Sequence, residues 1–256
     1  MENIKLLVLA IVQGISELLP VSSSGHLIFL GHLMEIDVST LLLTTLHLGT
    51  SIALVIFFRK TLFKDLFTKK KISFYLKILI SIIPIAIIGA VFEHRIEEAL
   101  RAHWIIAAAL IFWGVVMIVV DNVKIKVKYK SLEDIPLGKS IIIGVSQIFA
   151  LIPGTSRSAV STITGILLGL DKFTSLEYTF IMGIPVLLGS SIWEILKNIQ
   201  GTDYTLPPIV TLLIVLVVPL IVGYICLLLL KRVKKNKWLT VFGIYRIIIG
   251  LFILIF

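Results

Sequence analysis

Long apolar runs separated by short polar segments dominate the chain, and six of these runs are long enough to cross a bilayer. A transmembrane helix needs about 20 predominantly apolar residues, and the hydrophobic pattern meets this length repeatedly. The six predicted spans are residues 39–58, 74–92, 103–120, 173–197, 208–230 and 238–256. The pattern therefore predicts an all-α integral membrane protein with six transmembrane helices.

Two short polar breaks interrupt the remaining apolar sequence. Residues 20–26 read PVSSSGH and follow the segment QGISE at residues 13–17, and residues 153–158 read PGTSRS. Each break combines a proline, a glycine, several hydroxyls and an ionisable group. Backbone of this kind is tolerated at membrane depth only when it is buried in protein or lines a water-filled cavity. The two breaks are therefore the candidate functional site.

The positive charge lies in short segments between the predicted spans. The formal net charge is +9, and most of the basic residues fall in residues 59–71, 121–139 and 231–237. The positive-inside rule places these three segments in the cytoplasm. The other connections, residues 31–40, 93–102 and 201–207, carry few basic residues and belong outside. Because the basic residues form no continuous surface, the charge does not indicate a nucleic-acid partner.

The alternation of sides determines how the two breaks enter the membrane. Residues 139–170 begin in the cytoplasm, and the next span also leaves from the cytoplasm, so this segment must enter and return as a re-entrant helix-loop-helix hairpin. By analogy, residues 1–36 form a second re-entrant hairpin from the opposite face. Together with the six spans, the hairpins predict an inverted-topology repeat.

Similar short sequences in the two halves support this repeat. The sequence LGTSI at residues 48–52 corresponds to LGSSI at residues 188–192. Pro84 corresponds to Pro219, and Pro20 corresponds to Pro153. The matches keep the same order at nearly the same spacing, although chance similarity among apolar helices is the alternative. We predict one membrane domain over residues 1–256, with repeats of about 1–120 and 139–256.

The second break has the chemistry of an anion site. A guanidinium inside a membrane protein is costly unless an anion pairs with it, and its planar donors suit phosphate oxygens. The predicted substrate-binding residues here are Gly154, Thr155, Ser156, Arg157 and Ser158. The alternative is that Arg157 only forms a structural ion pair with Glu17.

The first break supplies groups that can transfer protons. Glu17 stands four residues after Gln13, so the two share a helical face, and a lone carboxylate can act as general base or hold a divalent cation. Ser22, Ser23 and Ser24 are candidates for substrate binding or nucleophilic attack, and at least one should cap the following helix. His26 is a candidate proton donor or nucleophile, or else a buried hydrogen-bonded imidazole.

Four further polar residues lie within apolar surroundings. His47, Gln147, Glu177 and Arg246 are candidates to support the site, with hydrogen bonding between helices as the alternative.

The two polar breaks and the residues around them resemble the motifs of a known family. Residues 13–26 and 151–158 are similar to the two signature motifs of the undecaprenyl-diphosphate phosphatases of the bacitracin-resistance type. Residues 47–50, 177–180 and 245–246 fit that family as well, so the resemblance covers nearly the whole chain.

The resemblance implies an enzyme of the plasma membrane that hydrolyses a long-chain polyprenyl diphosphate and so recycles the lipid carrier of cell-wall synthesis. It also implies dependence on Mg²⁺ or Ca²⁺ and a site that opens to the outer face. The working residues would be Glu17, Ser23, His26, Ser156 and Arg157, with Glu17 as the metal ligand, alone or with Gln13. Many members have glutamate at position 13, so the glutamine here removes one expected carboxylate. Attack by Ser23, by His26 or by water remains open.

A transporter or flippase for a prenyl phosphate or another anion is the rival prediction. Inverted repeats with broken helices at the midplane are typical of transporters. A carboxylate beside a serine and a histidine favours catalysis, because binding alone does not need a base next to a nucleophile. The expected partners are the polyprenyl lipid and membrane lipids, and the sequence leaves a homodimer open.

Overall fold

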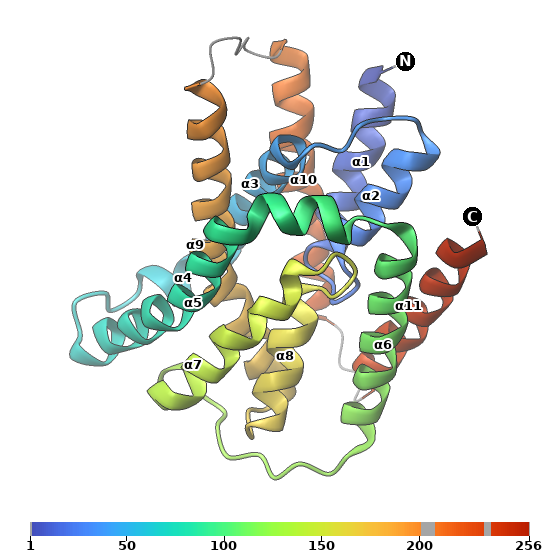
Figure 1. Cartoon of the computed structure of the whole chain (residues 1–256). Helices are drawn as coiled ribbons and strands as arrows, with labels where there is room; N and C mark the ends of the chain where they lie inside the picture. Colours follow the sequence, from blue (N-terminus) through green and yellow to red (C-terminus); the bar gives the residue numbers. More distant parts are fainter. Residues whose placement is uncertain (1, 201–207, 233–236, 256) are drawn as a thin grey trace.

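The computed structural model describes residues 2–200, 208–232 and 237–255, and this part of the chain is helical and contains no β-strand (Figure 1). The α-helices are α1 (Glu2–Ser16), α2 (Ser23–Leu33), α3 (Thr40–Phe57), α4 (Arg59–Phe63), α5 (Lys69–Leu100), α6 (His103–Asn122), α7 (Leu137–Ser146), α8 (Arg157–Leu167), α9 (Lys172–Ile199), α10 (Ile209–Leu230) and α11 (Trp238–Ile255). Two short 3₁₀ helices, η1 (Leu132–Asp134) and η2 (Gln147–Leu151), flank α7.

Within the described residues, six helices are long and apolar enough to cross a membrane: α3, α5, α6, α9, α10 and α11. The predicted all-α membrane fold with six spans is therefore confirmed, and the chain is a multi-pass membrane protein. The predicted connection at 201–207, the residues Lys234 and Lys235, and the final residue of the sixth predicted span, Phe256, lie outside the described residues.

Helix α5 is longer than the apolar run that predicted it. It begins at Lys69, where the hydroxyl of the N-cap residue Thr68 accepts a hydrogen bond of 3.3 Å from the Lys71 amide. It continues as helix to Leu100, so most of the predicted 93–102 connection is wrong as a loop. The hydrophobic pattern ends at residue 92, but a polar helix can extend beyond the membrane, because helical backbone satisfies its own hydrogen bonds in water as well as in lipid.

The four helices next to the two breaks are too short to span a bilayer. Helices α1 and α2 have 15 and 11 residues, and α7 and α8 have 10 and 11, whereas a span needs about 20. Figure 1 shows the pair α1 and α2 in the upper part of the molecule and the pair α7 and α8 in the lower part, with their connecting loops near the centre. Each pair is a hairpin whose tip is one of the two polar breaks.

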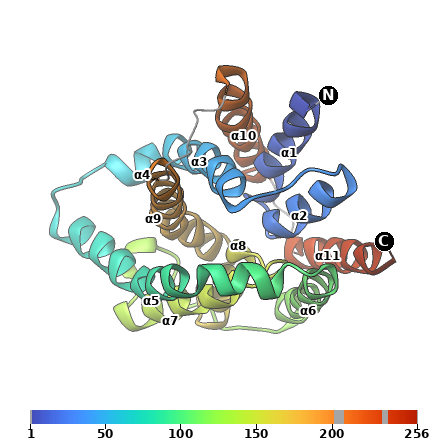
Figure 2. The ribbon, with the colours of Figure 1, turned by 45° about the horizontal axis from the view of Figure 1, so that its top comes forward.

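Close contact between glycines joins α6 and α11, which lie side by side in Figures 1 and 2. A Cβ atom on Gly114 would stand 2.7 Å from the Gly243 carbonyl oxygen, and one on Gly243 would stand 2.6 Å from the Gly114 oxygen. Small residues allow this approach of helix backbones in membranes. The crossing holds α11 close to the hairpin tips.

The described residues of the three basic connecting segments lie at one end of the molecule. Lys70 pairs with Glu133 at 3.4 Å, which joins the segment 59–71 to the segment 121–139. Lys237 donates to the Asn122 side-chain oxygen at 2.6 Å, which brings in the third segment. The charge pattern predicted this shared location.

The N-terminal helix and two further connections meet at the other end. The Lys5 ammonium donates to the Met34 carbonyl at 2.5 Å, and Arg101 donates to the Val38 carbonyl at 3.0 Å. These contacts join α1, the connection between α2 and α3, and the start of α6. The molecule therefore has a basic end and an opposite end, with the hairpin tips between them.

Candidate active site

The two breaks use the same backbone device. Ser22 and Ser156 are the N-cap residues of α2 and α8, and both have left-handed backbone, with φ of 74° and 72°. The Ser22 hydroxyl accepts from the Gly25 amide at 3.4 Å, and the Ser156 hydroxyl accepts from the Ala159 amide at 3.2 Å. A non-glycine residue held in this region costs about 1–3 kcal/mol and commonly marks a functional turn. The predicted cap in the first break is confirmed as Ser22.

The two hairpin tips touch each other. A Cβ atom on Gly25 would stand 3.4 Å from the Gly154 Cα atom, so the first turn of α2 lies against the second break. The Ser158 hydroxyl donates to the Leu19 carbonyl at 3.3 Å. Segments about 135 positions apart in the sequence thus form one site.

Glu17 is the centre of this site. It is 7% exposed, and its Oε1 atom accepts from Nη2 of Arg157 at 3.0 Å. Its Oε2 atom accepts from the Ser23 hydroxyl at 2.6 Å, from Nε2 of His47 at 3.3 Å and from the amide of Gln13 at 3.5 Å. The structure therefore brings together five of the residues that the sequence predicted.

Arg157 is placed by α8 and α9. Besides Glu17, its guanidinium donates through Nη1 to the Thr179 carbonyl at 3.4 Å. A Cβ atom on Gly183 would overlap the guanidinium, so the absence of a side chain at this position of α9 makes room for it. The predicted alternative, an ion pair with Glu17, is present. The ion pair uses one N–H donor, however, and a guanidinium has five. Three of them donate no hydrogen bond within the described residues.

His26 follows Ser23 by three residues on α2, and its imidazole bonds to the cap residue of α2 and to α11. Its Nδ1 atom is 2.7 Å from the Ser22 carbonyl oxygen, which can only accept, so Nδ1 carries the proton. Its Nε2 atom accepts from the Tyr245 hydroxyl at 2.9 Å, and the two rings stack. Within the described residues His26 makes no hydrogen bond with Glu17. Tyr245 was not among the predicted site residues, although residues 245–246 belong to the family resemblance and form a polar pair inside the apolar run of α11.

The other predicted binding residues line the two tips. The Thr155 hydroxyl is buried and has no hydrogen-bond partner among the residues that the structure describes. The Ser156 and Ser158 hydroxyls are 3.1 Å apart, and Ser24 is partly exposed. Gly154 has φ of 95°, a conformation that favours glycine. Their contacts with substrate stay predictions.

Two of the predicted supporting residues lie away from Glu17. The Gln147 amide contacts the sulfur of Met182 at 2.8 Å, and its oxygen is buried without a partner. Glu177 lies near the start of α9, at the basic end of the molecule. Neither has a hydrogen bond or ion pair with the Glu17 cluster in the part of the chain that the structure describes.

The donor set around Glu17 fits a resident divalent cation poorly. Hard cations take oxygen ligands, commonly from several carboxylates, and the described residues contain no group of three or more His, Cys, Asp or Glu side chains suited to a metal. Both Glu17 oxygens already accept from donors, one of them a guanidinium. The Gln13 oxygen is buried and unpartnered, but it is a single neutral ligand. Cation dependence stays a prediction, and no step below is assigned to a metal.

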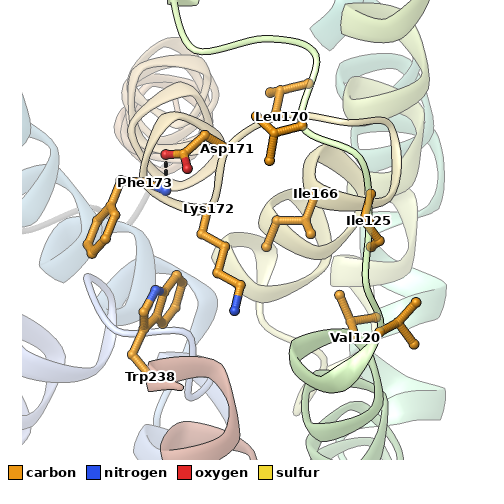
Figure 3. A pocket seen from close by; sticks show the side chains of 10 residues that line it. Val120, Ile125, Ile166, Leu170, Asp171, Lys172, Phe173 and Trp238 are labelled. Atoms are coloured by element: carbon orange, nitrogen blue, oxygen red, sulfur yellow. Dashed lines mark hydrogen bonds between the residues drawn. The ribbon is translucent and has the colours of Figure 1, made fainter. Parts of the chain in front are cut away.

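A small cavity at the basic end is separate from this site (Figure 3). Apolar side chains from the end of α6 and the segment after it line one wall, and Lys172, Phe173 and Trp238 line the other. Lys172 pairs with Asp121, which also accepts from the Thr240 hydroxyl at 2.7 Å. These bonds join the ends of α6, α9 and α11. The polar residues beside the cavity are therefore explained by their role in holding these helices together.

The fold and the site define a multi-pass α-helical membrane protein with a buried serine, carboxylate and arginine at the meeting point of two hairpins. The chain belongs to the family described as bacitracin resistance protein BacA, whose model matches residues 6–252. The match begins within α1, ends within α11 and covers the helices between them.

Curated relatives match over nearly the whole length of both chains. The undecaprenyl-diphosphatase of Enterococcus faecalis is 32% identical, with 99% of this chain and 96% of the relative covered. Undecaprenyl-diphosphatase 1 of Clostridioides difficile is 34% identical with the same coverage. The undecaprenyl-diphosphatase of Methanococcus aeolicus is 34% identical, with 100% and 99% covered. The transporter alternative finds no support among these names.

Proposed function

We propose that this protein is a membrane phosphatase that hydrolyses undecaprenyl diphosphate to the monophosphate and phosphate. The family and the names of the relatives support this activity. The single observation that carries the chemistry is the 2.6 Å hydrogen bond from the Ser23 hydroxyl to Glu17, beside the Arg157 guanidinium. A nucleophile, a base and a phosphate-binding cation are the parts that phosphoryl transfer requires.

In the proposed first step Ser23 attacks the terminal phosphorus. Its Oγ atom loses its proton to Glu17, the bond from Oγ to phosphorus forms, and the bond to the bridging oxygen breaks. The prenyl monophosphate leaves with the electron pair of that bond. Glu17 releases the serine proton to solvent before the second step. In that step Glu17 takes a proton from water, the water oxygen bonds to the phosphorus of the phosphoserine, and the bond from Oγ to phosphorus breaks. Glu17 returns the proton to Oγ as phosphate leaves. The same carboxylate thus serves as general base twice.

The neighbours of Glu17 keep it charged and in position. His47 donates to Oε2, and Gln13 donates both to Oε2 and, at 3.4 Å, to the Thr50 hydroxyl. Hydrogen bonds donated to Glu17 favour its carboxylate form. They also hold the Oε2 atom in a fixed orientation toward Ser23. Thr50 was not predicted, but it stands in the segment 48–52 that suggested the repeat.

Arg157 is the proposed ligand of the diphosphate. Its unused N–H donors, the unpartnered Thr155 hydroxyl and the first amides of α8 are donors of the kind that stabilise charge on a transferring phosphoryl group. His26, bonded to Tyr245, is left as a candidate for proton exchange with the departing group. The lipid tail stays in the bilayer while the charged head enters between the hairpin tips.

Phosphate release in detergent tests this function. Purified protein in micelles should release phosphate from a long-chain prenyl diphosphate at a rate proportional to enzyme concentration. Micelles have no second compartment, so release there cannot be transport. Absence of release from a folded preparation, with or without Mg²⁺ or Ca²⁺, would refute the proposal.

We place the protein in the plasma membrane, with the two hairpins re-entrant from opposite faces and the site open to the outer face. The matched caps at Ser22 and Ser156, the short hairpin helices and the shared basic end support this arrangement. By the positive-inside rule the basic end is cytoplasmic.

Cysteine labelling tests the orientation. We expect Lys70→Cys and Lys128→Cys, each made in a Cys226→Ser background, to resist a membrane-impermeant maleimide in intact cells and to react after lysis. Both positions are exposed at the basic end. Asp37→Cys is the matched control, since it is exposed at the opposite end and should react in intact cells. The reverse labelling pattern would show that the orientation is wrong.

A further inference from the structure

Arg246 is a fully buried guanidinium near the middle of α11, a helix that otherwise consists mainly of apolar residues. It is 0% exposed, and within the described residues it has no carboxylate partner. A charge held in a membrane protein is costly and usually marks function. The reaction proposed above assigns it no role.

The guanidinium donates to backbone carbonyls of both breaks. Nη1 donates to Pro20 at 3.1 Å, and Nη2 donates to Gly154 at 2.6 Å and to Thr155 at 2.9 Å. The remaining nitrogen, Nε, lies 3.5 Å from the Leu110 carbonyl of α6. One rigid planar group therefore joins the two hairpin tips to the α6 and α11 pair.

These carbonyls stand directly before the reacting residues. Pro20 precedes Ser23 by three positions, and Gly154 precedes Arg157 by the same number. Both tips turn through left-handed serines, which are strained and need surrounding contacts to persist. Because the Arg246 guanidinium holds a carbonyl of each tip, it fixes the distance between Ser23 and Arg157.

From this geometry we infer that Arg246 is a positioning residue, which sets the distance and angle between Ser23 and Arg157 for in-line attack. The inference rests on the proposed phosphatase function and adds a residue that does not touch the substrate. A bound geometry displaced by about 1 Å can cost roughly 10²-fold in rate. The alternative is that Arg246 only stabilises the fold.

Lysine at position 246 separates the two roles. It keeps the charge, but a compact ammonium with three donors cannot reproduce the planar contacts on both sides of the fork. We expect Arg246→Lys to lower kcat about 10- to 100-fold. KM should change less than about threefold, because the lipid tail and Arg157 still bind the substrate. Arg246→Gln carries no buried charge and is the second variant, with an equal or larger loss of kcat.

A matched control changes α11 without touching the tips. Thr240→Val removes a hydrogen bond of 2.7 Å between α11 and Asp121 of α6. The lost hydrogen bond should destabilise the protein by about 1 kcal/mol and so lower its melting temperature. The substitution should leave kcat unchanged. A loss of kcat in Thr240→Val equal to that in Arg246→Lys would mean that general loosening of α11 is the cause, which overturns the inference.

A distance measurement tests the positioning without any substrate. Nitroxide labels at Leu33→Cys on α2 and Leu167→Cys on α8, in a Cys226→Ser background, report on the two hairpins, and both positions are about half exposed. We expect a narrow distance distribution with Arg246 and with Thr240→Val, and a broader or shifted one with Arg246→Lys and Arg246→Gln.

The two readouts together decide the outcome. An unchanged label distribution in a folded Arg246 variant, or an unchanged kcat, overturns the inference. If the unaltered protein releases no phosphate, the proposed function fails, and the label distances still show whether Arg246 holds the tips together.

Discussion

Replacing Glu17 with glutamine should lower kcat by roughly 10³-fold, because it removes the carboxylate that accepts a hydrogen bond from the Ser23 hydroxyl. Glutamine keeps the shape and one hydrogen-bond acceptor, but it cannot take the serine proton. The measurement is the initial rate of phosphate release by purified protein in detergent. Wild-type turnover in this variant would exclude Glu17 as the base and leave His26 as the ionisable base in the first break.

Stability must be measured alongside this rate. Breaking a buried ion pair by neutralising one partner costs about 3–5 kcal/mol, and Arg157 is only 12% exposed. A thermal melt of the Glu17→Gln protein shows whether it remains folded at the assay temperature. The rate is then compared per folded molecule.

A second substitution separates proton transfer from metal binding. If Glu17 acts as the base at one fixed position, adding Gln13→Glu to the Glu17→Gln protein should restore no activity. If its role is to hold a cation, the returned carboxylate should restore some activity that depends on added Mg²⁺ or Ca²⁺. The structure favours the first result, since the Ser23 hydroxyl contacts Glu17 and not Gln13.

Arg157→Lys should lower kcat/KM by about 10²-fold, although it preserves the charge. The planar fork can contact Glu17, Thr179 and phosphate oxygens together, and an ammonium presents its three donors from a single atom. Kinetics with a long-chain prenyl diphosphate measure the loss. Near-normal kcat/KM would show that the role of Arg157 is confined to its ion pair with Glu17.

Gly183→Ala tests the placement of the same guanidinium with all charges kept. The added methyl group would overlap the Arg157 side chain, so we expect a loss in the same direction as in Arg157→Lys. Gly189→Ala, on the same helix, is the control, because nothing lies within 4 Å of its added Cβ. Equal activity of the two alanine variants would contradict the proposed placement.

The spans, the two breaks and the serine cap could be predicted because they depend on local properties. Apolar length indicates a span, and a cluster of hydroxyls at a helix start supplies its cap. The pairing of Glu17 with Arg157 was foreseen only as an alternative, because nothing in the local pattern fixes which side chains meet across 140 positions.

The partners of His26 and Arg246 could not be predicted for the same reason. The contact between His26 and Tyr245 depends on where α11 packs. The position of α11 depends in turn on the close glycine contact between α6 and α11. Arg246 binds carbonyls, which every residue carries, so its targets leave no signature in the sequence. The repeat boundaries at about 1–120 and 139–256 stay a prediction.

The stereochemical course at phosphorus tests the central claim, attack by Ser23, most directly. A substrate whose terminal phosphate is a thiophosphate made chiral with two oxygen isotopes is hydrolysed in water that carries the third isotope, and the configuration of the released inorganic thiophosphate is determined. Each in-line displacement inverts the phosphorus. Attack by Ser23 followed by water gives two inversions, so we expect net retention of configuration. Net inversion would show that water attacks the diphosphate directly and would contradict the role assigned to Ser23.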